Sequence, residues 1–377
     1  MFRASSIAAA AAAVVATSAW AHHGFGRFDP SREIELEGTL TGIDFVNPHS
    51  YMYFDAVAPD GTVTPMRCEM RAATVLRRSG WSEEMFVKGA HVEIVGRPHR
   101  DDPASCYIET LTIGDRPIER YQQFTETAPA APNRPARLAS GVPNLSGDWA
   151  QEQYLLARPP SGRGGLVPKS MVEAVEAGEL SMDDVPDAGW GARPVTLTDA
   201  GRAAVEALRN APLDANPRMR CEITSILFDW VFDGPINRIT QREGEITVEY
   251  GRGLTRTIHM DMETHPASLE PSRAGHSIGR WEGDTLVVET VGFLPGILAG
   301  QVAHSDQLRV VERFTLDPET MALRREYVAE DPLHFASPYV GGDTVMPADA
   351  PFAVDPCEEL TYINYAEEAA KTGEGAD

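Results

Sequence analysis

Outside its first 21 residues the sequence has no apolar run long enough to span a bilayer, so we expect no membrane-spanning helix. It also lacks a nucleotide-binding glycine motif, a zincin motif and a complete catalytic triad. Basic residues are few: 33 Lys and Arg stand against 56 Asp and Glu, which gives a net charge of −23. Such a surface repels phosphate backbones and anionic membranes, which argues against a nucleic-acid partner. We interpret the acidity as a source of solubility.

The first 21 residues have the pattern of a cleavable secretory signal. Arg3 gives the positive start, Ile7–Val15 the apolar core, and Ala19–Ala21 the small-x-small pattern of a cleavage site. The alternative is an uncleaved anchor, but the apolar core is too short to span a bilayer as a stable helix. Because no twin-arginine pair is present, we expect the general secretion route. The mature chain would begin at His22 and be periplasmic or secreted.

The mature chain is long enough for two domains with separate cores. The stretch 125–143 is rich in Ala, Pro and Asn and has no apolar periodicity, which indicates an extended linker. We therefore expect a first domain over 22–117, a linker over 118–145 and a second domain over 146–377.

The first domain alternates like an all-β unit. A short helix is expected at 71–79, closed by Gly80. Five strands are expected around it: Ile34–Phe45, Tyr51–Val57, Val63–Met70, His91–Val95 and Tyr107–Ile113. Five strands with one helix between the third and fourth follow the order of an OB-type barrel. A generic small β-barrel is the alternative.

The second domain begins with two expected helices. Ser170 and Glu173 predict a capping box for a helix ending at Gly178, and Thr198 predicts the N-cap of a helix to Asn210. After Cys221 the pattern changes to about eight strands separated by turns. Such turns lie within 242–250, within 280–290 and at 317–319. This pattern predicts an antiparallel, lipocalin-like barrel. Such a barrel is either filled by side chains or holds one small ligand.

Cysteine is scarce, and none of the four occurs in a C-x-x-C pair that would indicate a thiolate zinc site or a thioredoxin-like motif. An even number in an exported chain indicates disulfides, and four cysteines allow three connectivities. One connectivity keeps each bridge within a domain: Cys68–Cys106 with Cys221–Cys357. The third and fifth strands of an OB barrel are neighbours, which puts the first pair within reach.

Three segments of the first domain resemble a known family. They are AHHGFGRFD at 21–29, IDFVNPHSY at 43–51 and RRSGW at 77–81. The family comprises secreted proteobacterial proteins of unknown function (domain of unknown function 6152) that read AHHSF…NPH after the signal. The resemblance implies export but no established activity.

The second domain resembles a companion domain often fused to that family. The segments that carry this resemblance are LSGDWA at 145–150, LTDAG at 197–201, GHSIGRWEGDTLVVETVGF at 275–293, HSDQLRVVERF at 304–314 and EDP at 330–332. The chain departs from the pattern at Cys357-Glu358-Glu359, where relatives have Cys-His-Glu-Gly-Asn.

A histidine at the mature N-terminus suggests a metal site. The α-amino group and Nδ1 of His22, with a second imidazole, form a three-nitrogen brace that favours Cu(II). His49 is the best second arm; His23 and His99 are the reserves. Gly24 excludes the N-terminal copper motif that has histidine third. The alternative is that His22 and His23 are solvated and His49 hydrogen-bonds its own turn.

Gly275–Gly279 matches G-x-S-x-G, the nucleophile elbow of serine hydrolases, but a β-hairpin pattern follows where that motif requires a helix. We therefore do not expect a serine hydrolase. Histidines 259, 265, 276 and 304 and several acids, including Glu282 and Asp284, lie in the same domain, beside the apolar loop 292–298. As ligand-binding candidates we select His276, Ser277, Trp281, His304, Arg256 and Glu249. Structural hydrogen bonds and turn chemistry are the alternative.

Together these patterns predict an exported two-domain binding protein with a copper site and a barrel for a small apolar or aromatic molecule. One alternative is a periplasmic enzyme that uses the copper or the barrel histidines on such a substrate, and another is a structural envelope protein. The sequence does not choose among them and does not indicate the oligomeric state.

Overall fold

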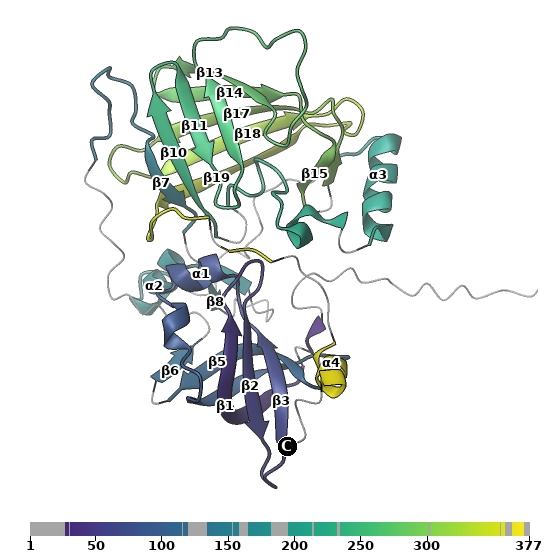
Figure 1. The fold of residues 1–377 in the computed structure, drawn as a ribbon. Coiled ribbons are helices and arrows are strands. Elements are labelled where there is room, and N and C mark those ends of the chain that lie inside the picture. The colour runs from purple at the N-terminus through teal and green to yellow at the C-terminus, as the bar shows by residue number, and fades with distance from the viewer. Residues whose placement is uncertain are drawn as a thin grey trace, which may run out of the picture.

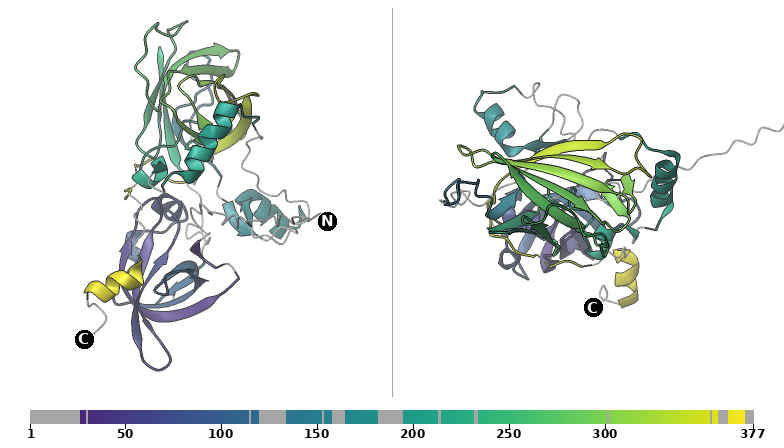
Figure 2. Two further views of the ribbon diagram at one scale, coloured as in Figure 1. Left: turned by 90° about the vertical axis from the view of Figure 1, so that its right-hand side faces the viewer. Right: turned by 90° about the horizontal axis from the view of Figure 1, so that it is seen from above.

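The computed structural model consists of two β-barrels, one above the other (Figure 1; Figure 2). It describes residues 27–372 except 30, 115, 120–133, 153, 158–164, 182–194, 213–214, 232–233, 301, 355 and 359–363. The expected signal sequence lies outside the described residues. The protein is mainly β, as the sequence predicts.

The first barrel has the OB-type strand order. Its strands are β1 (Ile34–Asp44), β2 (Tyr51–Val57), β3 (Val63–Glu69), β4 (His91–Pro98) and β5 (Ser105–Ile113). The sheet runs β3-β2-β1-β4-β5, and a parallel β3–β5 pairing closes it. Between β3 and β4 lie α1 (Ala73–Arg78) and the 3-10 turn η2 (Glu83–Met85), and β6 (Arg116–Glu119) extends the sheet beyond β5.

Alternation of side chains builds the core of this barrel. Along β2, Met52 and Phe54 point inward and are at most 1% exposed, whereas their neighbours are partly exposed. Gly38 allows β1 to cross β2 closely, because an added Cβ would lie 2.1 Å from the carbonyl oxygen of Asp55. The Cys68–Cys106 disulfide joins β3 to β5 inside the core, as expected from the sequence.

The second barrel closes in the order β10-β11-β12-β13-β14-β17-β18-β19-β7. These strands are β7 (Gly147–Ala150), β10 (Ile236–Arg242), β11 (Glu245–Glu249), β12 (Thr255–His259), β13 (His276–Glu282), β14 (Thr285–Val291), β17 (Arg309–Leu316), β18 (Leu323–Glu330) and β19 (Tyr339–Pro347). The expected antiparallel order holds except between β12 and β13, which are parallel because the chain crosses over between them.

Smaller elements lie outside the two barrels. They are β8 (Tyr154–Ala157), β9 (Gly165–Pro168), β15 (Gly296–Ala299), β16 (Val302–His304), α2 (Lys169–Glu176), α3 (Asp199–Asn210) and the 3-10 turn η5 (Pro217–Arg220). The Thr198 N-cap is confirmed, since its side chain accepts from the Gly201 amide at 3.0 Å. The expected Ser170–Glu173 capping box is wrong. Helix α2 begins one residue before Ser170, and the Ser170 amide donates to the Glu152 side chain instead.

The interior of the second barrel is filled. Arg256 donates to Glu312 at 2.5 Å, and Arg325 donates to Glu312 at 3.2 Å and to Asp343 at 2.5 Å. A segment over 223–231, which we call the inserted segment, packs into the barrel among these groups. Its carbonyls at Ile226 and Leu227 accept from Arg325 at 3.1 and 2.9 Å.

Two features join the barrels. Helix α1 lies at the end of the first barrel that faces the second (Figure 1). Its buried Arg78 donates to Asp349 at 2.8 Å and to the carbonyls of Gln151 and Gly234. After β19 the chain returns to the first barrel, where α4 (Tyr365–Thr372) begins with its Tyr365 amide bound to Asp102 at 2.7 Å. The C-terminal segment therefore contacts both barrels.

Candidate functional site

His49 lies in the turn between β1 and β2, directly after the cis Asn47–Pro48 peptide bond. Its Nδ1 lies 2.6 Å from Oε1 of Glu69, at the end of β3, and both side chains are mostly buried. The two atoms form an ion-pair contact without the in-line geometry of a hydrogen bond. A carboxylate this close still favours the proton on Nδ1, which leaves the lone pair on Nε2. His22 and His23 lie outside the described residues.

The first described residues run beside the end of β4 and His99, which follows it. The Arg27 carbonyl accepts from the Arg100 amide at 2.8 Å, and the Phe28 ring lies edge-on to the His99 ring at 5.4 Å. Burial is the main cause that lowers the pKa of His99, with Asp102 opposing it and Arg27 adding to it. Arg27 and Glu69 both act electrostatically on His99 and on Tyr51. Arg27 and His99 therefore lie in electrostatic range of Glu69, the partner of His49.

The His49 turn is tightly held at Asn47, which is 4% exposed. The Asn47 side chain pairs with Thr74 at the start of α1, donating from Nδ2 at 3.1 Å and accepting from the Thr74 amide at 3.3 Å. Its backbone amide donates to the Pro356 carbonyl at 2.9 Å, and its carbonyl accepts from the Glu358 amide at 3.0 Å. Two separate parts of the chain, the start of α1 and the segment 356–358, thus hold Asn47, two residues before His49.

Glu69 was not among the sequence candidates. A signal was available, because the β2–β3 hairpin pairs Tyr51 with Glu69 and His49 lies two residues before Tyr51. That register follows only once the two strands are paired correctly, and no local pattern around Glu69 indicates it.

The six candidate residues of the second barrel do not converge on one site. Arg256 and Ser277 point into the barrel and bond to each other at 2.9 Å. Trp281 packs against the same core. His276 is one residue from Ser277 and therefore points to the outer face, and Glu249 alternates outward beside the buried Val248.

Ser277 is not exposed as a catalytic nucleophile would be. It lies within β13, is 0% exposed, and shares a hydrogen-bond network with Arg256 and Thr290. A nucleophile elbow requires a turn between a strand and a helix, so the G-x-S-x-G match here is structural.

Three histidines gather on the outer face, under the crossover loop between β12 and β13. The Nδ1 atoms of His265 and His276 lie 2.8 Å apart, and His259 stacks on His276 with 4.9 Å between ring centroids. Burial is the main cause that lowers the pKa of His265 and of His276, and neighbouring histidines add to the effect at His276. These rings can share a proton and hold the loop on the barrel.

His304 lies elsewhere, at a small pocket between the inserted segment and the apolar loop 292–298. The ring is 5% exposed, its Nδ1 lies 3.0 Å from the Ser305 carbonyl, and burial is the main cause that lowers its pKa. Apolar side chains dominate the lining, with a few polar groups beside them: Ile226, Phe293, Leu294, Leu298 and Val310, then Ser225, Arg273 and His304. The enclosed space is about 10 Å³, close to that of one water molecule, so a larger apolar molecule would fit only if the loop 292–298 moves.

Fold and geometry thus define a mainly β protein of two barrels with a partly buried histidine–carboxylate pair in the first barrel. Residues 10–107 match the family of unknown function DUF6152, the family that the N-terminal segments resemble. A comparison with curated proteins found no match. Within the described ranges, no helix is long and apolar enough to cross a membrane, and no three His, Cys, Asp or Glu side chains form a metal site by themselves.

Proposed function

We propose that this is an exported binding protein whose first barrel holds one Cu(II) ion between the mature N-terminus and His49. The observation that carries the proposal is the 2.6 Å contact between His49 Nδ1 and Glu69. The nearby carboxylate favours a proton on Nδ1 and so favours Nε2 as the ligating nitrogen. His22 would supply its α-amino group and Nδ1, completing a tetragonal set of three nitrogens.

The distance along the chain permits this arrangement. Arg27 lies beside His99 and in electrostatic range of the groups around Glu69. The five residues from His22 to Arg27 reach about 17 Å when extended. His99, at the same location, is the reserve ligand, and His23 is the alternative from the N-terminus. Because the α-amino group must be released by cleavage after Ala21, the site also requires export.

Adding one residue before His22 is expected to weaken Cu(II) binding by at least tenfold, as much as His49→Ala does. The extension moves the amine away from the imidazole of His22 but leaves every side chain in place. The native protein should bind about one Cu(II) per chain, with a tetragonal, nitrogen-rich EPR signal. Binding should weaken as the pH falls, since the amine and imidazoles must lose protons before they ligate.

Two controls accompany this experiment. Intact mass must first show that the protein starts at His22. His91→Ala removes a histidine from β4 whose side chain is 54% exposed, and it should leave copper affinity unchanged. Equal affinity in the native and extended proteins would contradict the brace, and His22 and His23 would then be solvated residues.

The second barrel offers a second candidate function, binding of a small apolar or aromatic molecule. The pocket beside His304 favours it, because the charge network fills the rest of the interior. We propose that a ligand displaces the apolar loop 292–298 and binds between Phe293, Leu298 and His304. Conversion of such a compound to product would favour the enzyme alternative, and binding without conversion the binding protein. If no compound in a broad panel binds, the structural alternative is favoured.

Leu294→Ser is expected to weaken the binding of a fluorescent apolar probe about tenfold, because it removes apolar surface from the pocket mouth. Leu294 is 46% exposed, so the fold should tolerate the change. Leu333→Ser is the matched control, since Leu333 is 43% exposed and does not line the pocket. Fluorescence titration of the full chain measures both variants, and equal affinities would rule out this pocket.

A further inference from the structure

Residues 348–354 and 356–358, which we call the strap, cross from the second barrel to the His49 turn (Figure 1). Asp349 pairs with Arg78 at 2.8 Å, and the Pro351 carbonyl accepts from Arg77 at 3.2 Å. Further along, Cys357 forms a parallel β-bridge with Asn47. The strap therefore ends beside the residue that fixes the backbone before His49.

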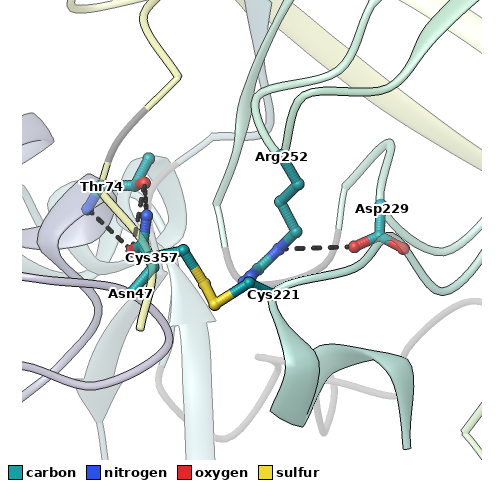
Figure 3. The surroundings of a disulfide bond; sticks show 6 residues. All are labelled: Asn47, Thr74, Cys221, Asp229, Arg252 and Cys357. Carbon is teal, nitrogen blue, oxygen red and sulfur yellow. Dashed lines mark hydrogen bonds and ion pairs between the residues drawn. A yellow bond between two sulfur atoms is a disulfide. The ribbon is translucent and has the colours of Figure 1, made fainter. Parts of the chain in front are cut away.

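The same Cys357 is covalently bound to the second barrel through Cys221 (Figure 3). Cys221 follows η5 and leads into the inserted segment. That segment is anchored by Asp229, which is 1% exposed and accepts from the Thr224 and Ser225 amides at 2.6 and 3.0 Å. Arg252, after β11, lies 3.5 Å from the same carboxylate. One end of the disulfide is thus fixed in the second barrel, and the other lies against Asn47.

We propose that the Cys221–Cys357 disulfide positions His49 for metal binding. The inference rests on the proposed function and adds a role for the second barrel in it. The bond holds Cys357 in register with Asn47, so that the Asn47 amide and carbonyl stay bound to the strap. With the Thr74 contact, these bonds keep the turn in the geometry that points His49 at Glu69. Cys221, Cys357 and Asn47 are positioning residues, because none of them needs to touch the metal.

The alternative is a purely structural disulfide that joins the barrels without affecting the turn. The paired variant Cys221→Ser/Cys357→Ser in the full chain separates the two roles. Hydrogen exchange of the peptide covering 45–50 reports on the turn without metal. Cu(II) affinity and the EPR spectrum report on the site. Val354→Ala is the matched control, because this strap residue is 59% exposed and the change preserves the disulfide.

We expect the paired variant to exchange the 45–50 amides at least tenfold faster, to lose at least tenfold in Cu(II) affinity and to change its EPR spectrum. Exchange in β2 should stay unchanged, which would show that the first barrel remains folded. Faster exchange with unchanged affinity and spectrum would overturn the positioning role, and so would unchanged exchange.

Failure of the proposed function gives a different result, because the wild-type protein itself would then not bind Cu(II). In that case the disulfide could not position His49 for metal binding either. The exchange data would still decide whether the disulfide holds the turn.

Discussion

Replacing Arg325 with Met is expected to lower the free energy of unfolding of the second barrel by about 3–5 kcal/mol. Arg325 is 0% exposed and pairs with Glu312 and Asp343. Burial alone would lower its pKa, but these two carboxylates raise the pKa above its ordinary value. Without the guanidinium, two buried carboxylates lose a counter-charge, and the carbonyls of the inserted segment lose their donor.

Urea unfolding followed by tryptophan fluorescence measures this loss, because Trp230 lies under the Arg325 guanidinium at 5.5 Å. Arg324→Met is the matched control. Arg324 is adjacent in the chain but points outward, with a side chain 67% exposed and paired with Glu326. Its replacement should change stability by less than about 1 kcal/mol. If both variants lost the same stability, the buried network would not be what holds the inserted segment.

The first barrel could be predicted from the sequence because its pattern is local. Apolar side chains at every second position, as in Met52, Phe54 and Ala56, fix both the strand and the face that it buries. The position of the helix between the third and fourth strands then selects the OB order. The disulfide partners Cys68 and Cys106 follow from that order, since β3 and β5 are adjacent.

The contents of the second barrel could not be predicted in this way. Alternation assigns Ser277 and His276 to opposite faces, but it does not say that Arg256 is matched by Glu312, 56 residues away. The inserted segment has apolar residues at helical spacing (Ile223, Ile226, Leu227 and Trp230), but it forms turns, and this spacing does not indicate that it enters the barrel. The sequence therefore predicts a barrel that can be filled or hollow, and long-range charge pairing decides that it is filled.

The candidate metal site also combines a residue that local sequence indicates with partners that are distant in the sequence. His49 is selected from the sequence because it follows Asn47 and Pro48 in a predicted turn, and its role as a ligand stays a prediction. Its partner Glu69 lies in the adjacent hairpin strand, and its support comes from the strap more than 300 residues later. The strap was assigned to the second domain because it follows that domain's last strand. Its bonds to Asn47 involve backbone groups, which leave no pattern in the side chains.

Replacing Cys68 and Cys106 with Ala is expected to lower the stability of the first barrel by about 4 kcal/mol. The disulfide closes a loop with a sequence separation of 38 residues, and its removal restores that freedom to the unfolded chain. Both cysteines are 0% exposed, and the β3–β5 pairing that they join is the seam that closes the barrel. In this variant only side-chain packing and the strand pairing hold β3 against β5.

Hydrogen exchange of peptides from β3 and β5 measures the loss locally, because the second barrel does not contribute to those peptides. The Cys221→Ser/Cys357→Ser variant is the comparison: it should speed exchange at the His49 turn and leave the seam protected. A loss below about 1 kcal/mol at the seam would mean that packing of Met66, Ile94 and Leu111 suffices to close it. Since Glu69 lies at the end of β3, opening the seam should also release His49, so this variant is expected to lose copper binding together with barrel stability.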